Sequence, residues 1–163
     1  MIRGRVWKYG RNVDTDGIYP ARYLVYFAPE EVAKHAMEDI DPDFSNKIAP
    51  GDIIVAEGNF GTGSAREQAA MALKFAKIGA VVADSFNRTF YRNAVNNALP
   101  VLALAGIAAQ VNEGDDLEID VEQGLIIDHT TGQRWSTDPM SPLLLDIIAH
   151  GGAIPYYRSK AKE

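Results

Sequence analysis

The order of apolar runs and amphipathic stretches in the middle of the chain constrains the fold more than any other feature. Three short apolar runs have the composition of buried strands, at residues 52–56, 80–83 and 100–104. Between them lie two helix candidates, residues 65–78, with Met71, Phe75 and Ile78 at helical spacing, and residues 89–97. This alternation predicts parallel strands joined by right-handed crossovers, and therefore an α/β fold.

The flanking segments add further elements to this core. Residues 2–9 alternate apolar and polar side chains and predict a strand, and residues 117–121 and 125–128 predict a hairpin that turns at Gln123-Gly124. Residues 29–37 and 142–150 predict helices, the second ended by Gly151-Gly152. No linker or repeat interrupts the 163 residues. We expect one domain over residues 1–163, with a mostly parallel core sheet flanked by helices and an added β-hairpin.

The residue types that are missing limit the chemistry of the chain. There is no cysteine, which excludes disulfides, thiolate metal sites, cysteine nucleophiles and an iron–sulfur cluster held by this chain alone. The three histidines, His35, His129 and His150, lie far apart without metal-ligand spacing. We therefore expect no metal bound by this chain, and any metal that takes part must come from another chain.

Charge and hydropathy narrow the classes of partner. The net charge of −6 argues against a nucleic-acid partner, because phosphates are held by clustered Lys and Arg, and it requires any anion recognition to be local. No apolar run approaches the roughly 20 residues that span a bilayer. The opening residues, Met1 to Trp7, lack the pattern of a secretory signal, so we expect a cytoplasmic protein without a membrane partner.

A glycine-rich segment, residues 57–67 (E-G-N-F-G-T-G-S-A-R-E), joins a predicted strand to a predicted helix. The start of a helix offers unpaired N–H groups and partial positive charge to a carboxylate or phosphate. In one interpretation, Ser64 to Glu67 is an S-x-x-E capping box, and Ser64 only stabilises the helix, by about 1 kcal/mol. In a second, Gly61-x-Gly63 and Asp84 belong to a dinucleotide site, but Arg66 replaces the third glycine of that motif.

Arg66 favours a third, catalytic interpretation. A cation at the positive end of a helix opposes the helix dipole and contributes little to stability. The same guanidinium would pair with the carboxylates of a dianionic substrate. Positive surroundings would also favour the alkoxide of Ser64, whose pKa is otherwise too high for a base.

Four ordered motifs carry a resemblance to a known family. Residues 58–67 resemble the G-x-N-F-G-x-G-S-S-R-E signature of 3-isopropylmalate dehydratase small subunits, which are similar to the swivelling domain of aconitase and homoaconitase. Residues 14–20 (D-T-D-G-I-Y-P) resemble its D-T-D-x-I-x-P, residues 83–86 its A-x-S-F, and Gly151-Gly152 its closing glycine pair. The resemblance spans nearly the whole chain.

The resemblance implies a hydro-lyase of leucine biosynthesis that isomerises 2-isopropylmalate and 3-isopropylmalate by dehydration and rehydration. In that family a large subunit carries a 4Fe-4S cluster as a Lewis acid, so the chain is expected to act only in a hetero-oligomer; whether it self-associates when alone is left open. On the same basis Ser64 is the catalytic base and Arg66 a substrate-carboxylate ligand, with Gly63 and Ala65 also at the substrate.

Residues 23–26 (Y-L-V-Y) are similar to the family's substrate-selecting loop. In relatives that act on tricarboxylates, an arginine stands at the place of Val25 and binds the extra carboxylate. Val25 has no group that could pair with such a carboxylate. The resemblance therefore implies an isopropyl or methyl substituent that meets Val25 and Tyr26; the alternative is that both only pack the loop. Arg22 is expected to pair with the substrate or with an acid of the partner subunit.

The chain departs from the family pattern at three positions of the glycine segment. Ala65 replaces the second serine, Gln68 stands where histidine is usual, and Thr62 where cysteine is common. These changes do not alter the expected reaction class, but they leave several substrates possible. The alternatives are a methylated malate of the citraconate type, a homoaconitase-like substrate, or a non-catalytic relative kept for binding or assembly.

Overall fold

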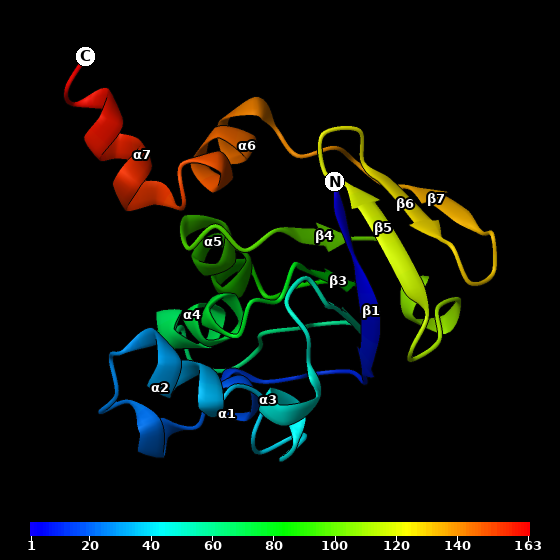
Figure 1. The fold of residues 1–163 in the computed structure, drawn as a ribbon, viewed down its shortest axis with the longest axis horizontal. Helices are drawn as coiled ribbons and strands as arrows, with labels where there is room; N and C mark the ends of the chain where they lie inside the picture. Colours follow the sequence, from blue (N-terminus) through cyan, green and yellow to red (C-terminus); the bar gives the residue numbers. More distant parts are fainter.

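The structure, a computed structural model, describes all 163 residues around one seven-stranded mixed sheet (Figure 1). The strands lie in the order β4-β3-β2-β1-β5-β6-β7. Their bounds are β1 Ile2–Tyr9, β2 Ile53–Ala56, β3 Ala80–Ala83, β4 Val101–Ala103, β5 Asp116–Asp120, β6 Leu125–Asp128 and β7 Arg134–Ser136. Strands β1 to β4 run parallel, and β5, β6 and β7 continue the sheet in antiparallel pairs.

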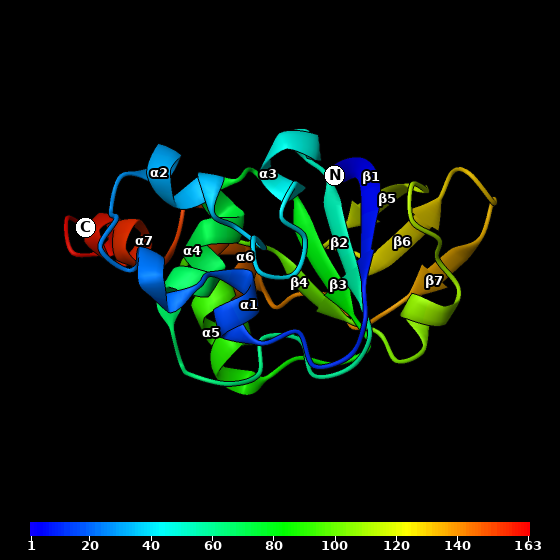
Figure 2. The same ribbon diagram turned by 90° about the horizontal axis from the view of Figure 1, so that it is seen from below.

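The helices gather on one side of the parallel strands, while the antiparallel strands lie at the other end of the molecule (Figure 2). Their bounds are α1 Thr15–Ile18, α2 Pro29–Lys34, α3 Phe44–Lys47, α4 Glu67–Phe75, α5 Arg88–Asn96, α6 Pro142–Ala149 and α7 Ala153–Lys160, with short 3-10 turns η1 Ala21–Tyr23 and η2 Ile107–Ala109. Helix α7 lies at the end opposite to β5, β6 and β7.

Two buried clusters explain why β2 and β3 are apolar at every position. Ile54 and Val81 belong to the larger cluster, which includes the buried side chains of α4 and α5. Ile53 and Val82 belong to the smaller one, with Leu117 and other residues of the antiparallel strands. Both faces of these strands are therefore covered, as expected for parallel strands with a layer on each side.

The α/β fold with a parallel core and a β-hairpin is confirmed, with several differences in detail. The hairpin is extended by β7, and α7 follows the glycine pair, neither of which the sequence pattern predicted. The predicted apolar face of residues 65–78 is correct at Ile78, which is buried, and at Phe75, which packs against the larger cluster, but not at Met71, which stays partly exposed outside it. Helix α4 is shorter than predicted, and its fully buried residues are Ala69, Ala70, Ala72 and Leu73.

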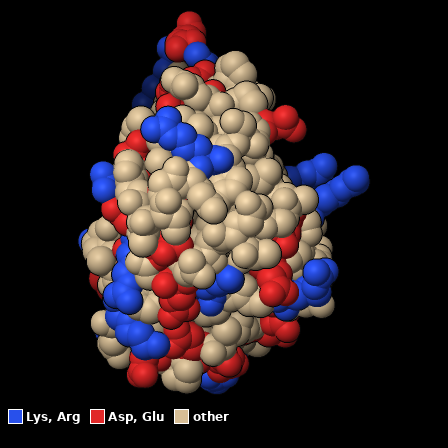
Figure 3. All heavy atoms as spheres, turned by 90° about the vertical axis from the view of Figure 1, so that its right-hand side faces the viewer, with Lys and Arg blue, Asp and Glu red and all other residues tan.

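The surface gives two further observations. None of the helices is both long enough and apolar enough to cross a membrane. On the face seen from the right-hand side of Figure 1, acidic and basic side chains are interspersed around a broad uncharged area (Figure 3). This face therefore presents no continuous patch of one charge sign.

Candidate active site

The glycine segment lies at the carboxyl edge of the parallel strands, between the loops that follow β1 and β3. The chain passes through left-handed backbone at Asn59, Gly61 and Gly63, with φ of 61°, 82° and 95°. The N–H of Gly61 donates to the carbonyl of Val13 over 2.7 Å, and Thr62 forms a bridge with Asp14. The positive φ angles explain the glycines, because a Cβ atom disfavours this backbone region.

Ser64 lies on this segment as an exposed residue, outside the helix. Helix α4 begins at Glu67, and its N-cap is Arg66, which has no side-chain capping bond, so the capping-box interpretation of Ser64 is wrong. The reason is local: the N–H of Arg66 donates to the carbonyl of Ser64 over 2.7 Å, which closes a separate turn before the helix. The same carbonyl accepts a 2.9 Å bond from the hydroxyl of buried Thr15, so the backbone is fixed while the Ser64 hydroxyl faces solvent.

The backbone N–H groups next to that hydroxyl have no partner within the chain. The backbone N–H groups of Gly63, Ser64 and Ala65 donate no hydrogen bond within the chain, whereas the N–H of Arg66, which follows them, does. Consecutive unpaired N–H groups in a glycine-bearing turn form a concavity that suits an anion. This places Gly63, Ser64 and Ala65 in one small region with donors available to a ligand.

Arg66 is held beside Ser64 by the loop that follows β1. Its guanidinium forms an ion pair with Asp16, Nη2 lies 3.4 Å from the Ser64 hydroxyl oxygen, and Nη1 lies 3.5 Å from the carbonyl of Tyr19. The Arg66 side chain is 20% exposed, so the cation is partly desolvated yet reachable. The sequence showed Asp16 in the motif of residues 14–20 but indicated no role for it. The available signal was an acidic residue in that motif and an arginine, Arg66, in the motif of residues 58–67, since two such charges can form an ion pair.

Tyr19 connects this region to the predicted selecting loop. Burial raises the pKa of the Tyr19 phenol, which stays protonated and donates a 2.7 Å bond to the carbonyl of Tyr23. Beyond it, the Val25 and Phe27 side chains are 71% and 82% exposed, so Val25 does not pack the loop. Tyr26 is stacked on His35, with ring centroids 5.6 Å apart.

Arg22 is paired inside the chain. Its guanidinium donates to both carboxylate oxygens of Asp39, over 2.5 and 3.0 Å. This pair holds the pKa of the Asp39 carboxyl below its usual value and raises that of Arg22. A role of Arg22 toward a substrate or a partner acid stays a prediction.

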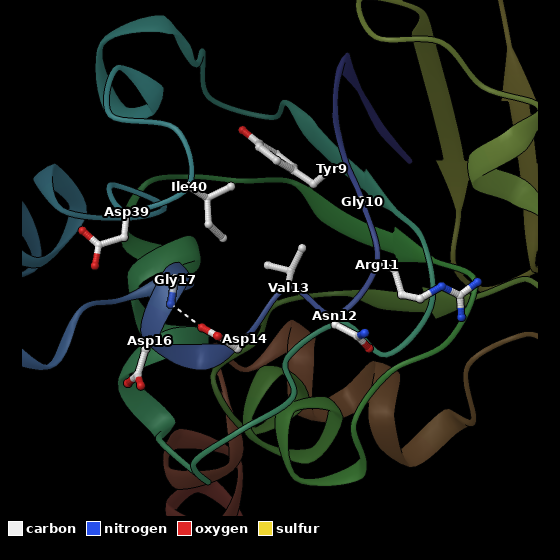
Figure 4. Close-up of a pocket in the computed structure, with 10 residues that line it drawn as sticks. All are labelled: Tyr9, Gly10, Arg11, Asn12, Val13, Asp14, Asp16, Gly17, Asp39 and Ile40. Atoms are coloured by element: carbon white, nitrogen blue, oxygen red, sulfur yellow. Dashed lines mark hydrogen bonds between the residues drawn. The ribbon is translucent and has the colours of Figure 1, made fainter.

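A hollow of about 450 Å³ adjoins the site at Asp16, the acid that pairs with Arg66 (Figure 4). Asp14 and Asp16 line it, and Asp14 accepts a 2.6 Å bond from the N–H of Gly17. Arg11 extends away from these two carboxylates. Neither Ser64 nor Arg66 lines this hollow or the four hollows lined by residues such as Arg88, Thr137, Lys34 and Ile154, and Ser64 itself is exposed, so the candidate site is described as an open surface.

The chain's own side chains do not fit a metal or an iron–sulfur cluster. It has no cysteine, and no three His, Asp or Glu side chains converge as a metal site would require. His35 is bonded to Glu38 and His150 to the carbonyl of Asp146. The carboxylate of Asp84 accepts the N–H of Ala108, which ties it to η2 and weakens the dinucleotide interpretation further.

Comparisons with known proteins identify the family of the chain. The model of the aconitase C-terminal domain family matches residues 11–106. The isopropylmalate/citramalate isomerase small subunit of Methanocaldococcus jannaschii is 51% identical over 163 residues, which is 100% of this chain and 97% of that protein. The 3-isopropylmalate dehydratase small subunit of Pyrobaculum calidifontis is 51% identical over 161 residues, 99% of each chain.

A solved structure extends the likeness to three dimensions. The crystal structure of a 3-isopropylmalate dehydratase from Methanocaldococcus jannaschii matches with a TM-score of 0.92 and 40% identity, over 98% of this chain and 95% of that one. The likeness in sequence and in fold thus covers essentially the whole chain. The chain therefore belongs to the aconitase C-terminal domain family and, within it, to the 3-isopropylmalate dehydratase small subunits.

Proposed function

We propose that this chain is the small subunit of a hydro-lyase that interconverts 2-isopropylmalate and 3-isopropylmalate, a step of leucine biosynthesis. The observation that carries the proposal is the exposed Ser64 hydroxyl beside the partly desolvated Arg66 guanidinium, on a surface with unpaired backbone N–H groups. Such a surface suits a dicarboxylate whose acidic carbon comes to the serine oxygen.

Each residue of the surface has a separate task in this proposal. Arg66 binds one substrate carboxylate through two parallel hydrogen bonds, which fixes the carbon next to it. Ser64, as its alkoxide, takes the proton from that carbon while hydroxide leaves the neighbouring carbon and the double bond forms; in the reverse direction hydroxide adds and the Ser64 hydroxyl returns the proton. The positive guanidinium and the N–H groups of Gly63 and Ala65 stabilise the negative charge that the proton transfer leaves. Asp16 keeps Arg66 in place when no substrate is bound.

The Lewis acid belongs to a partner in this proposal, because the side chains of this chain do not fit a cluster. A large subunit that carries the 4Fe-4S cluster would cover the open surface at Ser64 and complete the site. A cytoplasmic location and a single swivelling domain over residues 1–163, both expected from the sequence, are part of the same proposal.

The substrate is assigned from the tip of the loop after α1. Val25 offers an apolar, exposed side chain and no charge, which suits an alkyl substituent and leaves an extra carboxylate unpaired. A methylated malate is the second candidate, because the Methanocaldococcus jannaschii relative is named an isopropylmalate/citramalate isomerase small subunit.

Reconstitution tests the proposal. The purified chain is mixed with its cluster-loaded large subunit, and the loss of isopropylmaleate is followed, with citraconate and a tricarboxylate alkene as comparison substrates. We expect turnover from the mixture and none from either protein alone, with both alkyl-substituted substrates preferred to the tricarboxylate. A stable complex that turns over no substituted malate would instead identify a non-catalytic assembly subunit.

A further inference from the structure

A cluster of side chains just after α2 holds the loop whose tip is Val25 and Phe27. We call His35, Glu38 and Asp39 the loop clamp. Phe27 and Val25 project outward, whereas Tyr23 on the same loop faces the clamp. The loop therefore has an anchored side and a free apolar side.

Glu38 is the centre of the clamp. One carboxylate oxygen accepts a 2.9 Å bond from the Tyr23 hydroxyl, and the other lies 2.6 Å from Nδ1 of His35. An ionised carboxylate only accepts hydrogen bonds, so Nδ1 of His35 carries the hydrogen. Glu38 thus fixes both the phenol and the orientation of the imidazole ring.

Stacking adds a second contact between clamp and loop. The His35 ring lies on the Tyr23 ring with centroids 3.6 Å apart and planes 10° apart, and Tyr26 stacks beside them. The Arg22 guanidinium lies 4.6 Å from the centroid of the Tyr23 ring while it is bonded to both oxygens of Asp39. The consecutive loop residues Arg22 and Tyr23 are therefore held by Asp39 and Glu38, respectively.

The clamp is itself fixed by a strained turn. Met37 is fully buried with φ of 60°, and its N–H donates a 2.7 Å bond to the carbonyl of Ile18 in α1. A non-glycine residue keeps this backbone only where its surroundings enforce it. The turn places Glu38 and Asp39 against the loop, and α1 lies on the side of Arg66, whose guanidinium faces the carbonyl of Tyr19.

We propose that His35, Glu38 and Asp39 are positioning residues that set where the Val25 tip lies, and thereby which alkyl substituent the enzyme accepts. They touch no reacting atom and act through the loop residues Arg22, Tyr23 and Tyr26. This inference rests on the proposed function, because it requires the tip to meet the substrate. The contacts of the clamp, and not only the sequence of the loop, then determine how far Val25 lies from the Ser64 region.

The test compares Glu38→Ala with Glu30→Ala, which removes an exposed carboxylate that makes no bond in the structure. In the isolated chain, Glu38→Ala should speed amide hydrogen exchange over residues 22–27 about tenfold or more, while Glu30→Ala leaves it unchanged. In the complex with the large subunit, Glu38→Ala should raise KM for isopropylmalate about tenfold and KM for the methyl-substituted analogue less, with kcat within about twofold.

Tyr23→Phe removes a single oxygen and covers the case in which Glu38→Ala does not fold; it should shift the ratio of the two KM values in the same direction. Unchanged exchange together with an unchanged KM ratio in a folded variant would overturn the clamp, as would an equal fall of kcat for both substrates. If the wild-type complex shows no turnover, the proposed function fails, and the exchange measurement on the isolated chain still decides whether the clamp holds the loop.

Discussion

The shape of the glycine segment can be tested by placing a methyl group at each of its two left-handed glycines. At Gly61, with φ of 82°, a Cβ atom would lie 2.2 Å from Cγ of Phe90, far inside van der Waals contact. Phe90 is buried and its ring is packed edge-to-face against Phe60, with centroids 5.2 Å apart, so it has little room to move. At Gly63, with φ of 95°, the nearest atom would be Thr15 Oγ1 at an ordinary 3.4 Å.

The two variants separate backbone strain from overpacking. Left-handed backbone costs an alanine about 1–2 kcal/mol, and the clash at Gly61 adds about 1–3 kcal/mol of overpacking. Gly61→Ala should therefore lower the free energy of unfolding by about 2–5 kcal/mol, and Gly63→Ala by about 1–2 kcal/mol. Urea unfolding followed by tryptophan fluorescence measures both. Equal destabilisation by the two substitutions would refute this account of the segment.

Three further substitutions or conditions probe the site. Asp16→Ala should change the free energy of unfolding by less than about 1 kcal/mol, because the Asp16 side chain is 61% exposed, yet raise KM several-fold as Arg66 loses its hold; an unchanged KM would argue against that role. Val25→Arg should shift the kcat/KM preference of the complex toward a tricarboxylate, and no shift would remove the loop tip from substrate selection. Arg22 keeps the pKa of Asp39 below its usual 3.8, so the pair stabilises the fold above about pH 4 and loses its effect as pH falls further. The difference in thermal midpoint between wild type and Asp39→Asn should therefore shrink on acidification.

Local patterns in the sequence predicted the part of the fold that depends on local physics. Strands β2, β3 and β4 were found because their apolar runs are covered on both faces, and α6 because glycine ends it. The face of α4 was predicted only in part, because alanines fill most of its buried positions while the larger Met71 stays partly exposed. Strand β7 has only three residues and is held by its pairing with β6, which no local pattern encodes.

The sequence named candidate residues for the site, but it did not reveal the contacts between them. The motifs brought Ser64 and Arg66 to notice, and the structure places them side by side. The partnership of Arg66 with Asp16, and that of Arg22 with Asp39, join positions far apart in the chain and depend on the fold. The capping box failed because the turn closed by Arg66 separates Ser64 from the helix, a backbone detail that residue types do not reveal.

Ser64→Ala in the complex with the large subunit tests most directly whether the Ser64 oxygen transfers the proton. The residue is exposed and caps no helix, so the substitution should change the free energy of unfolding by no more than about 0.5 kcal/mol. Turnover of isopropylmalate should fall by about 10²–10⁴-fold, with KM within a few-fold of wild type. A folded Ser64→Ala complex that works at the wild-type rate would contradict the account.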